Sequence, residues 1–379
     1  MSVALTEEQE MLLEAASEFC KDRAPVTEFR RLRDEKNEVG FSRDLWREMT
    51  DLGWAGIMIP EEYGGFDFGF RGLGVILEET GKYLVASPLL STALIGVTAL
   101  RLAGNETQKQ DVLPAIAAGE RLLALALDEG SRHNPSSISC RAEKTAAGFK
   151  LSGEKSFVLD GHVADQLIVA ARTSGNDTDE KGITLFLVDG DASGLTRTRL
   201  HMVDSRNAAR IAFADVEVPE TAVLGEVDEG GPVLSKILDR ACIGLASEML
   251  GGTMEAFNQT VEYLRTRDQF GVPIGTFQAL QHRAAMMYCQ LELARASVHE
   301  ALAAVDEDSD DVPILASLAK AQLNEAYYHI GSEGIQLHGG IGMTDEHDIG
   351  LFYKRASVAM QAFGDTSYHR DRYATCKGY

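Results

Sequence analysis

The sequence is short of cysteine, of basic residues and of long apolar runs, and each shortage argues against a class of protein. Its five cysteines are scattered over 379 residues with no CxxC spacing, so we expect reduced thiols rather than a disulfide scaffold or a zinc site. Lysine and arginine total 36 against 58 aspartate and glutamate residues, giving a net charge of −22. This balance disfavours a nucleic-acid binder, which needs a basic face. The cysteines are Cys20, Cys140, Cys242, Cys289 and Cys376.

Targeting and metal signals are also missing from the sequence. Residues 1–9 are acidic and lack the basic and apolar regions of a signal or transit peptide. No apolar run is long enough to span a bilayer. We therefore expect a cytoplasmic protein without membrane insertion. The histidines do not cluster at ligand spacing, so no metal site is expected. The histidines considered are His133, His201, His282, His338, His347 and His369.

The first third of the chain has the apolar period of helices. Thr6 and Gln9 have capping-box spacing, Ser42 begins a second helix, and Asn105 caps a later one. The expected helices start at 6 and at 42, cover 72–83 and 88–103, and finish with 105–119.

From residue 122 the pattern changes to short β-type runs separated by turn residues. The expected strands cover 122–127, 149–151, 156–159, 166–170, 183–188, 211–213 and 216–218. Because no helical run lies between them, an antiparallel barrel or sandwich is expected, closed by Pro219 and Gly225.

The helical period returns near Gly231 and holds to the end of the chain. Pro232 suits the first turn of a helix. The expected helices cover 233–268, 277–305, 313–337, 348–358 and 366–373. Long helices of this kind suggest a bundle that buries faces in an oligomer. The predicted fold class is α+β, with a helical domain at 1–120, an antiparallel β-domain at 121–226 and a C-terminal four-helix bundle at 227–379.

Four stretches, in this order and at this spacing, resemble the acyl-CoA dehydrogenase family of flavoproteins. They are Ile57–Gly65, Phe213–Gly225, Arg267–Gln278 and Gln336–Gly342. The resemblance covers essentially the whole chain. It implies a helical domain, a β-domain and a four-helix domain that drives tetramer formation. It also implies oxidation of the Cα–Cβ bond of an acyl-CoA thioester: a carboxylate removes the α-proton, the β-hydride goes to flavin N5, and an electron-transfer flavoprotein takes the electrons.

Several residues of the last two stretches suit an FAD. Arg267 offers a planar fork for phosphate oxygens, and Gly339–Gly340 lets a ligand approach the backbone. Alone, each has an ordinary explanation, a helix-end charge for Arg267 and a helix C-terminus for the glycines. By resemblance they hold the adenosine and pyrophosphate half of an FAD whose ring lies against a neighbouring subunit. The implied cofactor-binding set is Arg267, Gln269, Phe270, Ile274, Phe277, Gln278, Gln336, Leu337, Gly339, Gly340 and Thr366.

The catalytic base has two candidate positions. Most of the family places a glutamate near the C-terminus, where this chain has Phe363 or Gly364. A branch resembling isovaleryl-CoA and long-chain dehydrogenases places its base on the long helix, just before an arginine, and that position is Asp239, supported by Arg240. Asp239 would take the α-proton once substrate excludes water. Its alternative role is an ion pair with Arg240 or Lys236, or a favourable charge near a helix N-terminus.

Asp365 is the second candidate base, and its alternative role is the N-cap of the last helix. The β-domain departs from the family at two polar flavin contacts. Leu127 stands where a threonine hydrogen-bonds the flavin, and Leu159 replaces a second polar residue.

Three interpretations remain open. The chain is a homotetrameric dehydrogenase with Asp239 as base, or one subunit of a heterotetramer with a paralogous subunit that holds the flavin ring and the base. In the third, it is a structural paralogue without FAD.

Overall fold

The computed structural model describes residues 5–379, and its contacts divide the chain into two compact units. The first comprises residues up to Arg31, Phe70–Val85 and Cys242–Tyr379, and the second comprises Leu32–Gly69 and Ala86–Ala241. The order of elements is helices, a β-sheet and helices again, as the sequence predicts. The bounds of the three predicted domains follow chain order and remain predictions, because the contacts group the chain differently.

The helical part of the second unit is built from short, well-capped elements. Ser42 accepts a hydrogen bond from Leu45 N at 3.2 Å, and Asn105 and Gln108 form a capping box. The run predicted as one helix after Pro88 is in fact a π-helix that continues into an α-helix. The elements are α3 (Arg43–Asp51), η1 (Glu61–Tyr63), η2 (Leu89–Gly96), α5 (Val97–Ala103) and α6 (Glu106–Ala117).

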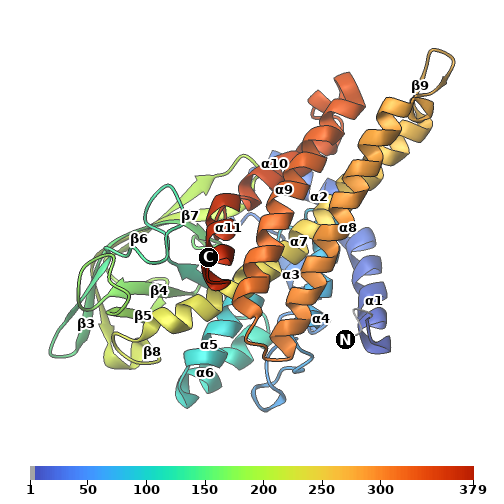
Figure 1. Cartoon of the computed structure of the whole chain (residues 1–379). Coiled ribbons are helices and arrows are strands. Elements are labelled where there is room, and N and C mark those ends of the chain that lie inside the picture. Colours follow the sequence, from blue (N-terminus) through green and yellow to red (C-terminus); the bar gives the residue numbers. More distant parts are fainter. Residues whose placement is uncertain (1–4) are drawn as a thin grey trace. The chain divides into compact units, whose positions relative to one another are not determined.

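The sheet of the second unit has the strand order β6-β7-β3-β2-β4-β5-β8, with β1 also pairing with β4 (Figure 1). It is mostly antiparallel, as predicted, but β1 runs parallel to β4. The strands are β1 (Leu123–Ala126), β2 (Arg141–Lys144), β3 (Gly148–Leu159), β4 (Gln166–Arg172), β5 (Ile183–Asp189), β6 (Leu195–His201), β7 (Asn207–Pro219) and β8 (Val223–Leu224).

Two strands each join two of the runs that the sequence pattern predicts, and three strands of the sheet, β2, β6 and the two-residue β8, were not predicted. β3 and β7 each join two predicted runs, because Gly153 and Asp215, which resemble turn residues, are absorbed as irregularities with positive φ. β2 and β6 have mostly exposed or half-exposed side chains and therefore show no apolar alternation.

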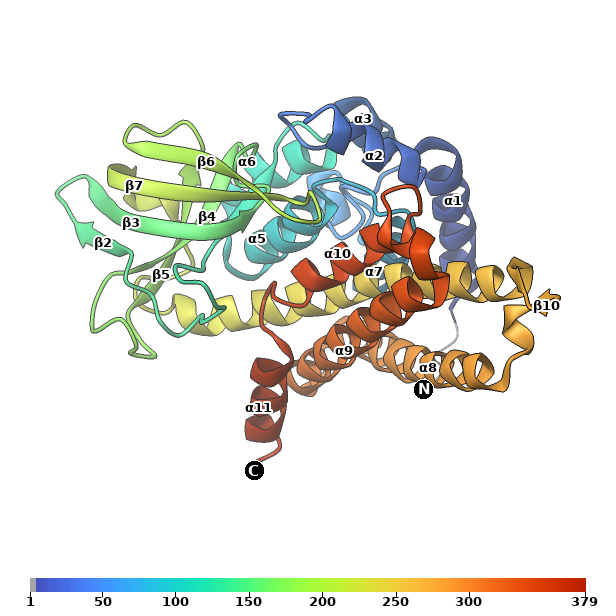
Figure 2. The ribbon, with the colours of Figure 1, turned by 90° about the horizontal axis from the view of Figure 1, so that it is seen from above.

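The first unit is helical. The helices α8 and α9 pack side by side, and α10 and α11 pack against α9 (Figures 1 and 2). Thr6 caps α1 through a capping box, as predicted. The elements of this unit are α1 (Glu7–Arg23), α4 (Phe70–Lys82), β9 (Asp268–Gln269), β10 (Val272–Pro273), η4 (Ile274–Thr276), α8 (Gln278–Asp306), α9 (Val312–His338), η5 (Gly339–Met343), α10 (Ile349–Ala359) and α11 (Thr366–Cys376).

The longest helix, α7 (Gly230–Thr266), belongs to the second unit as far as Ala241 and to the first unit beyond it. It has Pro232 in its first turn, as predicted. Within the first unit it crosses α4 closely: a Cβ on Gly251 would lie 1.8 Å from the carbonyl oxygen of Glu78. Glycine is therefore required there by the approach of the two backbones. The helix α2 (Val26–Asp34) likewise runs from the first unit into the second, which begins at Leu32.

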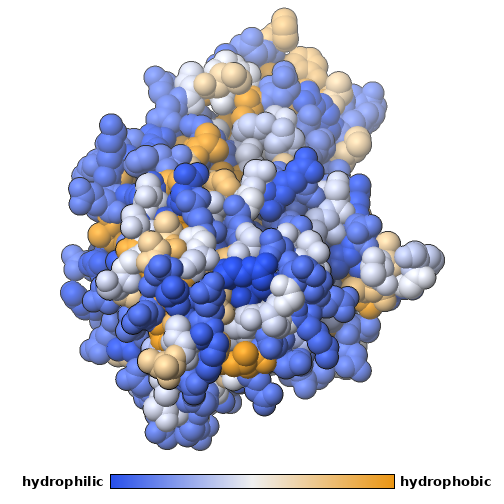
Figure 3. All heavy atoms as spheres, turned by 90° about the vertical axis from the view of Figure 1, so that its left-hand side faces the viewer, coloured by the Kyte–Doolittle hydropathy of each residue, from blue (hydrophilic) through white to orange (hydrophobic). Residues whose placement is uncertain are grey.

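The surface seen in Figure 3 is mostly hydrophilic, with hydrophobic residues in small scattered groups. Among residues 5–379, no helix combines the length and the apolar character needed to cross a bilayer.

Candidate active site

The predicted cofactor segment after α7 forms a tight hairpin in the first unit. β9 and β10 pair through a two-residue loop in which Phe270 and Gly271 have φ values of 56° and 83°. Two successive positive φ values are typical of a type I′ turn. The hairpin leaves the ring of Phe270 92% exposed and in edge contact with the ring of Phe277, at 6.1 Å between centroids. Arg267 is exposed at the start of the segment.

The second predicted cofactor segment lies at the end of α9. Gln336 is exposed and Leu337 is buried. Gly339 has φ 64° and ψ −136°, a conformation open to glycine, and a Cβ on Gly339 or Gly340 would meet no atom within 4 Å. The backbone here is therefore accessible to a ligand from outside the chain.

Tyr263 brings these two segments together. Its ring lies 4.5 Å from the His338 ring, and its carbonyl oxygen accepts a hydrogen bond from Arg267 N at 2.9 Å. The exposed arginine and the exposed glycines thus belong to neighbouring helix ends. The remaining candidates of the hairpin segment are exposed or half-exposed, and they are Gln269, Ile274 and Gln278.

Thr366 lies apart from the other predicted cofactor residues. It begins α11, just after Gly364, whose carbonyl oxygen accepts a hydrogen bond from Lys320 at 3.2 Å. Along α9, Lys320 and Gln336 are separated by roughly 24 Å, at 1.5 Å rise per residue. Within one chain, Thr366 therefore cannot contact the same part of a ligand as Gln336.

The candidate base Asp239 is buried in the first part of α7, with 2% of its surface exposed. The neighbouring Arg240 is half-exposed and donates a hydrogen bond from Nη1 to the carbonyl oxygen of Lys236, one turn earlier. Consecutive residues of a helix point in different directions, so the carboxylate is enclosed while the guanidinium follows the helix surface.

The other candidate base, Asp365, serves as a helix cap. Its Oδ1 accepts a hydrogen bond from Tyr368 N at 2.8 Å at the start of α11. This geometry is that of the N-cap, the alternative that the sequence raised for Asp365.

The segment after β1, which carries Leu127, is held by a buried ion pair within the second unit. Lys155 is fully buried, and its Nζ donates to the carbonyl oxygen of Leu127 at 2.9 Å and to Glu129 Oε1 at 2.7 Å. Although burial favours the neutral acid, Lys155 and hydrogen bonds from Ser139 and Cys140 lower the pKa of Glu129. Leu127 is buried and Leu159 half-buried.

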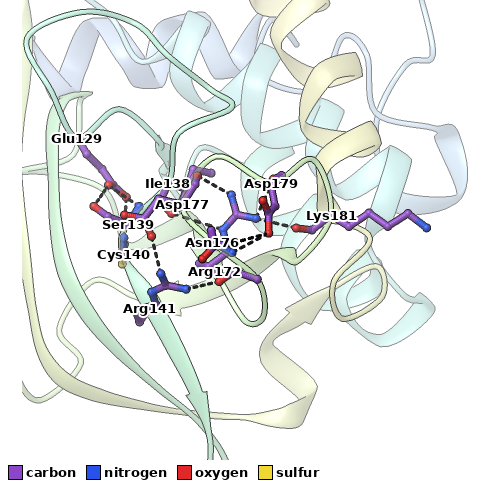
Figure 4. Close-up of polar contacts among 11 residues, drawn as sticks. Glu129, Ile138, Ser139, Cys140, Arg141, Arg172, Asn176, Asp177, Asp179 and Lys181 are labelled. Atoms are coloured by element: carbon purple, nitrogen blue, oxygen red, sulfur yellow. Dashed lines mark hydrogen bonds and ion pairs between the residues drawn. The ribbon is translucent and has the colours of Figure 1, made fainter.

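A second buried cation fixes the neighbouring loop (Figure 4). The Arg172 guanidinium, 1% exposed, donates to four backbone carbonyl oxygens at 2.7–3.5 Å. The four carbonyls belong to Ile138, Asp177, Asp179 and Lys181. The sequence offered one signal for these cations: Lys155 and Arg172 lie in or beside apolar strand patterns where a charge is unexpected.

Among residues 5–379, no group of three or more histidine, cysteine or acidic side chains is arranged to hold a metal ion.

Comparison with known proteins identifies the family. The chain matches the acyl-CoA dehydrogenase N-terminal domain at residues 6–120, the middle domain at 126–216 and the C-terminal domain at 228–375. It therefore belongs to the acyl-CoA dehydrogenase family, a family of FAD-dependent oxidoreductases.

Two curated relatives and one solved structure show how far the similarity extends. Isovaleryl-CoA dehydrogenase of Bos taurus is 31% identical, with 97% of this chain and 87% of the relative covered. Acyl-CoA dehydrogenase IpdE2 of Mycolicibacterium smegmatis is 31% identical, with 95% and 96% covered. The ChsE4-ChsE5 complex from Mycobacterium tuberculosis contains a chain that superposes with a TM-score of 0.88 at 25% identity, with 99% of this chain and 98% of that chain covered.

Proposed function

We propose that this chain dehydrogenates an acyl-CoA thioester to the 2-enoyl-CoA, with Asp239 as the base, and that the electrons pass to an electron-transfer flavoprotein. The observation that carries the proposal is the contrast between two carboxylates. Asp239 is enclosed on α7 with 2% of its surface exposed, whereas Asp365 is engaged as the cap of α11. Of the two candidates, Asp239 is the one not already used by a helix terminus.

The residues at the ends of α7 and α9 fit the adenosine and diphosphate of FAD. Arg267 provides an exposed fork of donors for phosphate oxygens, and the open backbone at Gly339–Gly340 permits close approach. Phe270 and Phe277 add exposed aromatic faces. FAD supplies the acceptor for the hydride that leaves the β-carbon. Because Lys320, which bonds the turn before Thr366, lies about 24 Å from Gln336 along α9, Thr366 would serve a different cofactor molecule of the assembly from the one that Gln336 serves.

Asp239 would remove the α-proton of the thioester. Enclosure keeps bulk water from its carboxylate, so that a proton moved there comes from the substrate. Arg240 stabilises the helix surface beside it through its bond to the carbonyl oxygen of Lys236. The resemblance to the isovaleryl-CoA dehydrogenase branch, which implies a base at this position of the long helix, is in line with the 31% identity to an isovaleryl-CoA dehydrogenase.

A second function has its own support. Leu127 and Leu159 offer no side-chain donor at the two positions where the family resemblance implies flavin contacts. One of the similar structures is a complex of two named proteins, ChsE4 and ChsE5. The alternative is therefore a subunit of a heterotetramer, which contributes the adenosine-binding half of the site to a paralogous partner.

One experiment separates these functions. The chain is expressed alone, its FAD content per chain and its mass in solution are measured, and the flavin absorbance is followed after anaerobic mixing with acyl-CoA thioesters. About one FAD per chain in a tetramer, with bleaching by acyl-CoA, is expected for the homotetrameric dehydrogenase. About one-half FAD per chain, or FAD only after a paralogue is added, favours the mixed complex. No FAD under either condition contradicts both.

A further inference from the structure

In the first unit, the segment that follows α9 folds back onto the end of that helix, where two histidines meet. A Cβ on Gly342 would lie 2.6 Å from the carbonyl oxygen of Ile335 and 3.0 Å from the Cβ of His338, so η5 packs directly against α9. His338 is 2% exposed, and its ring centroid lies 4.5 Å from that of Tyr263 and 4.2 Å from that of His347. The histidine pair therefore joins α9 to the chain just before α10.

Hydrogen bonds determine which nitrogen of each neutral ring carries the proton. His338 Nδ1 donates to the carbonyl oxygen of Gly334 at 2.7 Å, so its Nε2 carries no proton while the ring is neutral. His347 Nδ1 accepts a hydrogen bond from Ile349 N at 3.1 Å, which leaves the proton of this ring on Nε2. Ile349 is the first residue of α10, and the N–H groups of a first helical turn have no partner within the helix. The bond that satisfies this one requires an uncharged His347.

Protonation disturbs the arrangement at both rings. A proton on His347 Nδ1 turns the acceptor into a donor that faces the Ile349 N–H, and the hydrogen bond is lost. A proton on His338 Nε2 places a charge on a nitrogen that is buried and has no hydrogen-bond partner among residues 5–379. Because the two rings are neighbours, charging both also brings two like charges together.

The charged groups around the pair come from α2 and from the segment itself. Arg30, on α2, donates from Nε to Asp348 Oδ1 at 2.7 Å and from Nη1 to Asp345 Oδ2 at 3.3 Å. Glu346 is exposed to solvent, and α7 contributes the uncharged ring of Tyr263. Arg30 thus tethers the segment by two ion pairs and places a further positive charge beside the histidines.

The balance of these influences keeps both histidines neutral. Burial lowers the pKa of His347 from its ordinary value of 6.5, Asp348 raises it and Arg30 lowers it. Burial likewise lowers the pKa of His338, the bond to the Gly334 carbonyl raises it and His347 lowers it. Between the lowered values and 6.5 the opened segment binds more protons than the closed one. The closed form is therefore most stable above pH 6.5 and loses stability as pH falls through that value.

We propose that His338 and His347 form an acid-sensitive latch, which holds residues 339–348 against α9 while both rings are neutral and releases them when the rings are protonated. The inference rests on the proposed function for one consequence, because Gly339 and Gly340 belong to the proposed FAD site. Release of the segment removes a preorganised backbone from the ligand, so FAD should dissociate faster in acid. The two histidines are positioning residues and need not touch the cofactor.

Hydrogen exchange of the amides of residues 339–349 tests the latch without reference to catalysis. The wild-type protein is compared at pH 7.5 and 5.5 with FAD in excess, after correction for the intrinsic exchange rates. Protection should fall about three- to tenfold at pH 5.5, since one histidine of pKa 6.5 contributes at most about elevenfold at that pH. Equal protection at the two pH values in the wild-type protein would disprove the latch.

Two variants assign the effect to the pair. His347→Asn offers an amide oxygen to the Ile349 N–H and does not titrate, so it should lose less protection on acidification than the wild type does. His282→Asn is the matched control, because His282 is exposed on α8, and it should keep the full acid sensitivity. If His347→Asn is as acid-sensitive as the wild type, or if His282→Asn abolishes the sensitivity, the latch is wrong.

FAD release separates a failure of the latch from a failure of the proposed function. The dissociation rate of FAD, followed by flavin fluorescence, should rise between pH 7.5 and 5.5 in the wild type and in His282→Asn, and should rise less in His347→Asn. Slower release in acid would show that the added charge attracts the diphosphate directly, and would overturn the positioning role. If the protein binds no FAD at either pH, the proposed function fails, and the exchange measurement alone decides whether the latch exists.

Discussion

The ring of Tyr263 lies 4.5 Å, centroid to centroid, from the imidazole of His338. This contact joins the end of α7 to the end of α9. The exposed arginine that follows one helix and the open glycines that follow the other therefore keep a fixed spacing. Such preorganised donors bind an anionic ligand with little loss of conformational entropy.

Replacement of Arg267 tests the anionic-ligand role of this pair of helix ends. Arg267→Met should weaken FAD binding at least about tenfold, because a charge-assisted bond to phosphate contributes about 1.5–3 kcal/mol. FAD content after dialysis and titration of the apoprotein measure the change. Arg265→Met is the matched control, since Arg265 lies two residues earlier in the last turn of α7 and is also exposed. If Arg265→Met weakened FAD binding as much as Arg267→Met, the effect would come from the loss of positive charge in general and not from a contact of Arg267.

If Asp239 is the base, its replacement should leave FAD binding intact and slow the transfer of the α-proton. Asp239→Asn should retain FAD and lose acyl-CoA-dependent flavin bleaching by a factor of about 10² to 10⁴, the usual contribution of a general base. Rapid mixing under anaerobic conditions measures the bleaching rate. A variant that bleaches at the wild-type rate would show that another group takes the proton.

Asp365 should matter for stability and not for the proton transfer. Asp365→Asn keeps a good N-cap and should leave both bleaching and unfolding close to wild type, whereas Asp365→Ala should lower the free energy of unfolding by about 1 kcal/mol. Urea unfolding measures the stability of each variant, and the bleaching assay measures its proton transfer. Loss of bleaching in Asp365→Asn, with normal stability, would move the catalytic role to this residue.

Burial of the Lys320 ammonium group, which bonds the carbonyl oxygens of Ala359 and Gly364, lowers the pKa of Lys320 from 10.5 to about 8. Between these two values the unfolded chain binds more protons at this lysine than the folded chain, so its contribution to stability increases with pH. Below about pH 8 the cost of burying the ammonium group is fully present. The difference in unfolding free energy between wild type and Lys320→Met should therefore shift in favour of wild type, by on the order of 1–3 kcal/mol, as pH rises from 8 to 10.

The comparison with Lys320→Met is needed because other groups titrate in the same range. Burial raises the pKa of Cys20 to about 12 and that of Cys140 to about 11, which opposes the effect of Lys320 at high pH. These thiols are present in both proteins and cancel in the difference. A difference that stays constant from pH 8 to 10 would show that Lys320 titrates at its ordinary value.

Removal of the Glu129 charge should destabilise the β-domain. Glu129→Gln leaves the Lys155 ammonium buried without its counter-charge, which costs about 3 kcal/mol or more. Because the pKa of Glu129 is lowered below its ordinary value of 4.5, its stabilising effect is present above that pH and is lost as pH falls through the folded-state value. Urea unfolding at neutral and acidic pH measures both effects. Glu143→Gln, on the exposed side of β2, should change little.

Local signals in the sequence predicted much of the fold. The caps at Thr6, Ser42, Asn105 and Asp365 depend on residues within a few positions of one another, and the structure shows a capping bond at each. The family assignment came from ordered stretches along the whole chain, and all three domain matches confirm it. The cofactor and base assignments depend on ligands and neighbouring subunits and remain predictions.

Long-range polar packing could not be predicted in the same way. Lys320 and Asn324 are polar residues four apart in an apolar helix, a spacing that places them together. Their partners, Ala359 and Gly364, lie about forty residues later, and nothing local in the sequence connects the two. The π-helix was missed because its residues are all apolar or small, a composition that fits an α-helix equally well.

That π-helix has a consequence for insertions and deletions. Thr92, inside it, bonds both the N–H and the carbonyl oxygen of Leu123 on β1, and Ser91 bonds Asp160. A π-helix arises when a turn holds one more residue than an α-helix, so deleting a residue between Leu89 and Gly96 would rotate the downstream α5 by about 100° about its axis. Side chains of α5 that face the core would then face away from it. Proteins that share this fold are therefore expected to keep the number of residues in this segment, as well as its apolar composition.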